Sequence, residues 1–131
     1  MLKGSVVAHF CKRLLAGEVL EVFGDGEQTR DYLYFGDLTD GICQAIDQRV
    51  TGVYQLGTNI PTSLNQLLAT LQEVVGDTYT MDVRYVDAKQ GEIKHTWCDI
   101  AKARAEFSYD PQTPLYEGIQ KTWHWFLQQK S

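Results

Sequence analysis

Apolar residues along the chain change from helical to strand-like spacing within the first quarter of the sequence. Residues 6–15 carry apolar side chains at a three-to-four spacing, and Gly17 follows as a helix stop. Residues 19–23 (VLEVF) and 29–35 (TRDYLYF) are strand-like runs on either side of Gly-Asp-Gly-Glu, a cluster typical of a tight turn. We therefore expect a helix followed by a hairpin around that turn.

Helices and strands continue to alternate downstream. Asp37 is expected to cap a second helix, and Ser63 with Gln66 forms a capping box that opens a helix running to Gly76. The remaining predictions are short strands at 53–57 and 81–86, a helix from Asp99 through Phe107, and a last helix with Pro114 at its first position. This alternation favours the α/β class.

Length and composition fit one ordinary globular domain, residues 1–131, with 44% hydrophobic and 22% charged residues. Trp97, Trp123 and Trp125 are candidate core residues. The net charge of −5 argues against a nucleic-acid or anionic-membrane surface, which requires a basic excess. A small anionic ligand remains compatible with it, because a few placed cations suffice locally.

The cysteines and the apolar runs give a cellular context. Cys11, Cys43 and Cys98 are odd in number and far apart, so we expect buried reduced thiols rather than disulfides or a metal site. No apolar run approaches the roughly 20 residues of a membrane span. A cytoplasmic location is the expectation.

Two motif matches do not support catalysis or cofactor binding. Gly24-Asp25-Gly26 lacks the third glycine and the following helix of a dinucleotide fingerprint. Tyr85 and Lys89 have the Tyr-x-x-x-Lys spacing, but they lie on a predicted strand, where positions four apart are about 13 Å from each other. The three histidines have no ligand-like spacing.

Three segments in order, 22–38 (VFGDGEQTRDYLYFGDL), 53–68 and 89–111, carry a resemblance that covers most of the chain, together with the closing TPLYEGIQKTWHWF. They resemble the C-terminal, substrate-binding part of extended short-chain dehydrogenase/reductase (SDR) proteins. The match is to the NAD-dependent epimerase/dehydratase family, with UDP-glucose 4-epimerase as the most similar type. The resemblance implies a small mixed α/β substrate-binding portion without the Rossmann half.

The resemblance also implies a substrate-binding set of four residues. Arg30, after the turn, is at the family position that reaches the diphosphate of a sugar nucleotide, and a guanidinium suits phosphate oxygens. Phe23 is at the position whose backbone lies against the base. Lys89 and Glu92 match an Arg-x-Gly-Asp/Glu motif for diphosphate and ribose, with lysine in place of the arginine. The alternative for Arg30 is a surface ion pair with Asp31 or Asp25.

What the resemblance places upstream is missing from these 131 residues. The family's glycine-rich NAD site and its catalytic Tyr-x-x-x-Lys helix belong to the Rossmann half. We therefore expect no catalytic residue, cofactor site or metal site here, NAD only in the full-length family protein, and no epimerase activity from this chain alone. The expected partners are a UDP- or dTDP-sugar, and either the missing half or a second copy at residues 31–46, with no nucleic acid or membrane.

Several alternatives remain open at this stage. The chain is either a fragment, a truncated gene product or one half of a split enzyme. A freestanding, non-catalytic binding or assembly module is the second hypothesis, favoured by Lys89 and by Gly36, which replaces a frequent family acid. The motif around Arg30 looks most like 4-epimerases, but the residues do not choose between epimerase, dehydratase and decarboxylase.

Overall fold

The computed structural model describes residues 6–129 and has a mixed α/β fold, as predicted. The elements in order are α1 (Val6–Ala16), β1 (Leu20–Phe23), β2 (Thr29–Arg30), α2 (Phe35–Asp47), β3 (Thr62–Ser63), α3 (Leu64–Val75), β4 (Val83–Val86), α4 (Ala101–Phe107) and α5 (Leu115–Gln129). The strands form two small sheets. β1 pairs with β4 in parallel, and β2 pairs with β3 antiparallel.

The hairpin prediction is therefore wrong, although the bend at its centre is present. β1 and β2 flank the bend but belong to different sheets, because the chain turns away from β1 after Phe23. Gly24 and Gly26 have φ angles of 88° and 78°, the left-handed region that glycine adopts without strain. The parallel partner of β1 comes from the other end of a long connection, since Leu20 lies opposite Val83.

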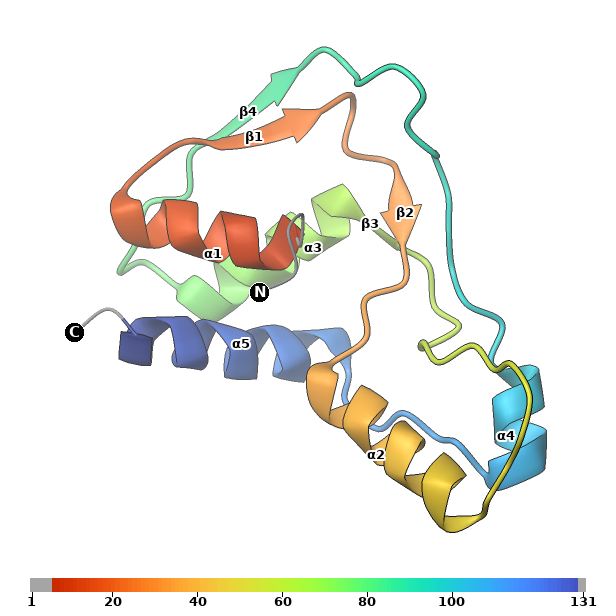
Figure 1. The fold of residues 1–131 in the computed structure, drawn as a ribbon. Helices are drawn as coiled ribbons and strands as arrows, with labels where there is room; N and C mark the ends of the chain where they lie inside the picture. Colours follow the sequence, from red (N-terminus) through yellow and green to blue (C-terminus); the bar gives the residue numbers. More distant parts are fainter. Residues whose placement is uncertain (1–5, 130–131) are drawn as a thin grey trace.

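Figure 1 shows two groups of elements joined by β2 and β3. In the first, β1 and β4 lie beside α1, α3 and α5; in the second, α2 and α4 lie together at the opposite end. We call the buried set of the first group the large core; it comprises Phe10, Cys11, Leu14, Leu20, Val22, Leu64, Leu67, Leu68, Leu71, Val75, Ile119, Trp123 and Phe126. The small core of the second group comprises Ile100, Ala103, Phe107 and Tyr109.

Most of the predicted helices are confirmed. The Ser63 capping box is present in both directions, and α3 ends at Gly76, as expected. α1 ends at Ala16, before Gly17 with a φ of 73°. Pro114 was expected at the first position of the last helix but lies one residue before α5, where its carbonyl accepts from the Gly118 N–H.

Two other local predictions are wrong. α2 begins at Phe35, and Asp37 is buried inside its first turn, where its carboxylate accepts from Gln112 N–H, Thr113 N–H and the Thr113 hydroxyl. It thus ties α2 to the start of α5 rather than capping α2. Residues 53–57 form no strand. Side chains from α4 and from the segment after it bind their backbone; the Tyr109 hydroxyl, for example, donates to the Gly57 carbonyl.

The tryptophans and cysteines are less buried than expected. Trp123 is buried, but Trp97 and Trp125 are more than half exposed. Cys11 is buried and burial raises the pKa of its thiol to about 12, whereas Cys43 is exposed and Cys98 is partly buried. All three are free thiols. Among residues 6–129, no helix combines the length and apolar character needed to cross a bilayer.

Candidate substrate site

Two bends in the chain bring the four predicted substrate-binding residues together in pairs. The first is the Gly24–Gly26 bend, which separates Phe23 from Arg30. The second spans Lys89 to Glu92, where the Glu92 N–H donates to the Lys89 carbonyl and Gly91 has a φ of 82°. Each bend contributes one residue to each pair.

The Arg30–Glu92 pair is an ion pair at the surface. The Arg30 Nη2 atom lies 3.4 Å from Glu92 Oε1, and the side chains are 31% and 32% exposed. Arg30 Nη1 donates to the Thr29 carbonyl at 2.7 Å and to the Lys94 carbonyl at 3.4 Å. The alternative ion pair of Arg30 with Asp31 or Asp25 is not what the structure shows. A partly exposed pair of this kind contributes only about 0–1 kcal/mol, so a ligand can replace it at little cost.

The second pair is a cation–π contact. The Lys89 Nζ atom lies 4.3 Å from the centroid of the Phe23 ring. Such contacts contribute about 0.5–1 kcal/mol at exposed positions. Lys89 is therefore held over the aromatic residue that ends β1, on the same short turn that carries Glu92.

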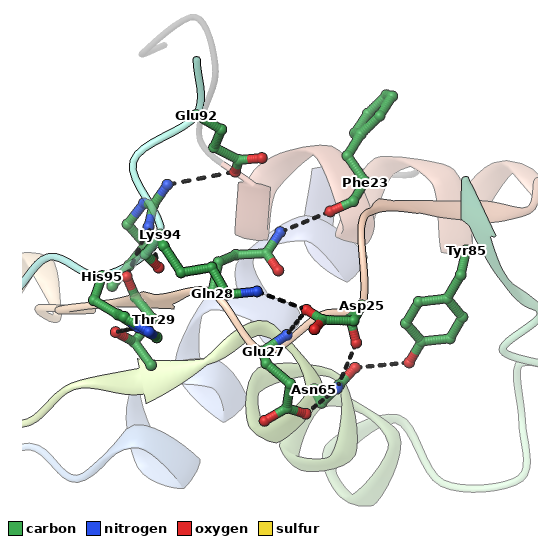
Figure 2. Close-up of polar contacts among 11 residues, drawn as sticks. Phe23, Asp25, Glu27, Gln28, Thr29, Asn65, Tyr85, Glu92, Lys94 and His95 are labelled. Carbon is green, nitrogen blue, oxygen red and sulfur yellow. Dashed lines mark hydrogen bonds and ion pairs between the residues drawn. The ribbon is translucent and has the colours of Figure 1, made fainter. Parts of the chain in front are cut away.

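The segment after Glu92 runs alongside β2 and fixes Arg30 from one side. The Thr29 N–H donates to the Lys94 carbonyl, and the Thr96 N–H donates to the Thr29 carbonyl. Thr29 Oγ1 also lies 2.9 Å from His95 Nδ1 (Figure 2). His95 is thus in hydrogen-bond contact with the site strand, a position that its sequence spacing did not indicate.

An exposed ion pair connects the same segment to the Gly24–Gly26 bend. Lys94 Nζ lies 2.9 Å from Asp25 Oδ1, and Asp25 Oδ1 also accepts from the Glu27 N–H (Figure 2). The Glu27 N–H and then Lys94 hold the pKa of the Asp25 carboxyl below its usual value. Both side chains of the ion pair are more than half exposed, so it orients the bend more than it stabilises the fold.

Asp31 has a structural role that the sequence did not reveal. Its carboxylate accepts hydrogen bonds from Thr58 N–H and hydroxyl, Asn59 N–H and Cys98 N–H, at 2.6–3.1 Å. It therefore joins two loops beside the strand that carries Arg30. In the sequence, the adjacent Arg30 suggested itself as the partner of Asp31. The groups that donate hydrogen bonds to Asp31 lie 27 to 67 positions away.

The Tyr-x-x-x-Lys spacing brings no catalytic pair together. The Tyr85 hydroxyl donates to Asn65 Oδ1 at 2.7 Å, while Lys89 lies over Phe23. Nor does the glycine pair fit a dinucleotide, because Gly24–Gly26 leads into β2 and not into a helix N-terminus. Within the described part of the chain, no three His, Cys, Asp or Glu side chains are arranged to hold a metal ion.

Comparisons with known proteins identify a family to which the chain is similar. Residues 2–57 match the model of the NAD dependent epimerase/dehydratase family. The chain is 32% identical to UDP-glucuronic acid decarboxylase 1 of Xenopus tropicalis over 96% of its length, which is 30% of that protein. It is also 32% identical to UDP-glucose 4-epimerase of Mycolicibacterium smegmatis, covering 95% of this chain and 39% of that protein.

Solved structures show the same relationship. The UDP-glucose 4-epimerase of Thermotoga maritima with UDP-glucose has a TM-score of 0.86 and 31% identity, covering 99% of this chain and 41% of that one. A UDP-glucuronic acid 4-epimerase of Bacillus cereus, with UDP-glucuronic acid and NAD, has a TM-score of 0.86 at 26% identity, covering 95% and 40%. The fold is that of part of an extended SDR enzyme.

The resemblance found in the sequence is therefore confirmed. The chain is related in sequence and fold to the NAD dependent epimerase/dehydratase family, and its relatives include both nucleotide-sugar 4-epimerases and a decarboxylase. It spans 30% to 41% of the length of the relatives named above.

Proposed function

We propose that this chain is the nucleotide-diphosphate-sugar-binding portion of an NAD-dependent sugar epimerase or dehydratase. The observation that carries the proposal is the meeting of Phe23, Arg30, Lys89 and Glu92 at two bends that lie far apart in the sequence. Related structures hold UDP-glucose and UDP-glucuronic acid, which supports a UDP-sugar as the ligand class.

The roles follow from the chemistry of each side chain. The planar guanidinium of Arg30 offers paired donors to the diphosphate once Glu92 turns to the ribose hydroxyls. Lys89 supplies a second positive charge, as a point charge without the two-pronged geometry of arginine. The backbone at Phe23 lies against the base. These contacts orient the substrate and move no proton or hydride.

The chemical step belongs outside these residues. NAD supplies hydride transfer in the enzymes of this kind that use it, and the described residues do not fit a dinucleotide. We propose that residues 1–131 form a single substrate domain, inactive in epimerisation by itself, that works with a nucleotide-binding portion. An assay of UDP-glucose and UDP-galactose interconversion with added NAD tests this; turnover by the purified chain would contradict it.

The surface of α2 supports a partner in that arrangement. Phe35, Ile42 and Ile46 on this helix are 75%, 46% and 68% exposed, and Val53 nearby in sequence is 84% exposed. A cavity of about 440 Å³ lies between residues 31–38 and the N-terminal parts of α1 and α5, with Tyr32, Tyr34 and Leu38 among its lining. Apolar surface of this extent usually has a partner, and we propose the nucleotide-binding portion or, failing that, a second copy.

A freestanding assembly module is the second candidate. Two departures from the family pattern favour it: Lys89 contacts Phe23, and position 36 is glycine. A Cβ at position 36 would lie 2.7 Å from the Tyr34 ring, so the acid frequent in the family requires Tyr34 to move. A module of this kind would keep the fold and lose diphosphate affinity.

Calorimetric titration with UDP separates the two candidates. We expect saturable binding by the wild-type chain and a loss of tenfold or more in Arg30→Ala, about 1.4 kcal/mol. Arg104→Ala is the matched control, because it removes the same charge from α4, where the Arg104 side chain forms a surface ion pair with Asp110. If the folded chain does not bind UDP, or if Arg30→Ala binds UDP as tightly as the wild type, the result contradicts the proposed function and favours the assembly module.

A further inference from the structure

One side chain contacts both the Gly24–Gly26 bend and β4, the strand that precedes the turn carrying Lys89 and Glu92. Asn65 lies in the first turn of α3, next to the Gly24–Gly26 bend (Figure 2). Its Nδ2 donates to the Asp25 carbonyl at 3.0 Å and to Glu27 Oε1 at 2.6 Å, and its backbone N–H donates to the Gly26 carbonyl at 2.9 Å. Three hydrogen bonds thus fix the bend that sets the position of Arg30 relative to Phe23.

The other side of the same amide is bound to β4. Asn65 Oδ1 accepts from the Tyr85 hydroxyl at 2.7 Å. Tyr85 lies opposite Val22 in the parallel pair, and β4 leads directly into the turn that carries Lys89 and Glu92. Figure 2 shows Tyr85 and Glu27 on opposite sides of Asn65.

The chemistry of the contact requires an amide at this position. A carboxamide of this length has an acceptor oxygen for Tyr85 and two N–H donors for the bend, whereas a carboxylate has no donor and an aliphatic side chain has neither. The packing is equally specific. A Cβ on Gly26 would lie 2.1 Å from Asn65 Oδ1, so the absence of a side chain at 26 lets the amide approach.

We propose that Asn65 is a positioning residue for the diphosphate site, holding the bend before Arg30 and the strand before Lys89 and Glu92 in one fixed relation. The proposal rests on the proposed function, in which those residues bind a nucleotide diphosphate. The Asp25–Lys94 ion pair also joins the two segments, but it is well exposed and weak. Asn65 joins the bend to β4 through three side-chain hydrogen bonds, whereas the Asp25–Lys94 contact is a single ion pair.

The main test is a double-mutant cycle on UDP affinity. Asn65→Asp removes both N–H donors and sets a carboxylate against Glu27, so we expect the affinity for UDP to fall about tenfold. Tyr85→Phe removes one hydrogen bond, so we expect the affinity for UDP to fall about threefold. Because part of the effect acts through Arg30, both changes should lower UDP affinity by a clearly smaller factor in an Arg30→Ala background. Thr70→Val, which removes a side-chain hydrogen bond on the same helix, should leave the wild-type affinity unchanged.

A purely structural role gives a different result. Asn65→Asp would then lower affinity by the same factor with and without Arg30, in parallel with a loss of thermal stability, and the proposal would be overturned. Tyr85→Phe guards against misfolding of the first variant, since the Tyr85 ring is 53% exposed and only its hydroxyl is removed.

A ligand-free measurement separates this inference from the proposed function. If the wild-type chain binds no UDP, the proposed function fails, and amide ¹H–¹⁵N spectra decide the role of Asn65. Coupling of the two segments predicts that Asn65→Asp and Tyr85→Phe each shift the amides of residues 27–30 and 87–94 together. Shifts confined to residues 24–27 in Asn65→Asp, with 87–94 unchanged, would overturn the proposal.

Discussion

The large core and the small core differ in how completely their elements enclose them. The large core draws buried side chains from α1, β1, α3 and α5, so each apolar face meets another. The small core draws its four buried residues from α4 and its flanks, while α2 contributes only Asp37 and Gly41 to the buried interior. Phe23 of the candidate site ends β1 in the well-enclosed region, whereas the exposed apolar side chains of the proposed partner surface lie on α2 in the open one. Substrate binding and docking thus involve regions that are enclosed to different degrees.

Removing a side chain from the large core should have the largest effect. Phe10 on α1 is only 1% exposed. Phe10→Ala should lower the free energy of unfolding by about 3–5 kcal/mol, because apolar burial is lost and a cavity is left. Urea unfolding followed by far-UV circular dichroism measures this. Phe35→Ala, at a residue 75% exposed, is the matched control. A cost below about 1 kcal/mol for Phe10→Ala would contradict the enclosure described here.

Overpacking the contact between α2 and the small core should have an intermediate and local effect. A Cβ at Gly41 would lie 2.9 Å from two ring atoms of Tyr109, so Gly41→Val should cost about 1–3 kcal/mol. Hydrogen exchange should speed up in α2 and α4 while α3 and α5 keep their protection. Equal loss of protection in all four helices would show that the two regions unfold as one unit.

The small core should also respond to alkaline pH. Burial, with Asp37 and Asp31 nearby, raises the pKa of Tyr109 to about 12, above the usual value of about 10. Folding therefore favours the neutral phenol, whose hydroxyl donates to the Gly57 carbonyl at 2.7 Å. This contribution is complete below about pH 10 and is lost as the pH rises through about 12. The melting temperature should change less between pH 9 and pH 11.5 in Tyr109→Phe than in the wild type. An equal change in both proteins would exclude the ionisation of Tyr109 as the cause.

Changes on the exposed face of α2 should have the smallest effect on stability. Ile46 is 68% exposed, so Ile46→Gln should change the free energy of unfolding by less than about 0.5 kcal/mol. Sedimentation velocity should nevertheless show less self-association at high concentration if this face joins two copies. Asp40→Asn, on the same helix, serves as the control. A marked loss of stability in Ile46→Gln would show that this side chain is packed.

Local signals in the sequence predicted most of the helices because the determinants of a helix lie within it. The Ser63 capping box and the glycines after α1 and α3 are read from adjacent residues, and each marks an observed boundary. Pairing of strands was not predictable in this way. The runs around Gly24–Gly26 were expected to pair with each other, but β1 instead pairs with β4, about 60 positions away.

The site shows the same limit. Four residues were predicted from the family resemblance, and the structure brings them together in pairs, but these pairwise contacts were not foreseen. Asp37 and Asp31 were assigned local roles, as a helix cap and a surface partner, because a sequence offers only near neighbours as candidates. Their actual donors, at residues 112–113 and at 58, 59 and 98, come from distant segments.

The long separations within the site have a kinetic consequence. The Arg30–Glu92 contact spans 62 positions and the Asp25–Lys94 contact spans 69. Contacts of such long range form slowly, because a large loop must close before they can offset its lost entropy. α1 and α3 are each continuous in sequence, whereas the meeting of the two bends requires both halves of the chain. A ligand that needs Arg30 and Glu92 at once would therefore bind only chains that have finished folding.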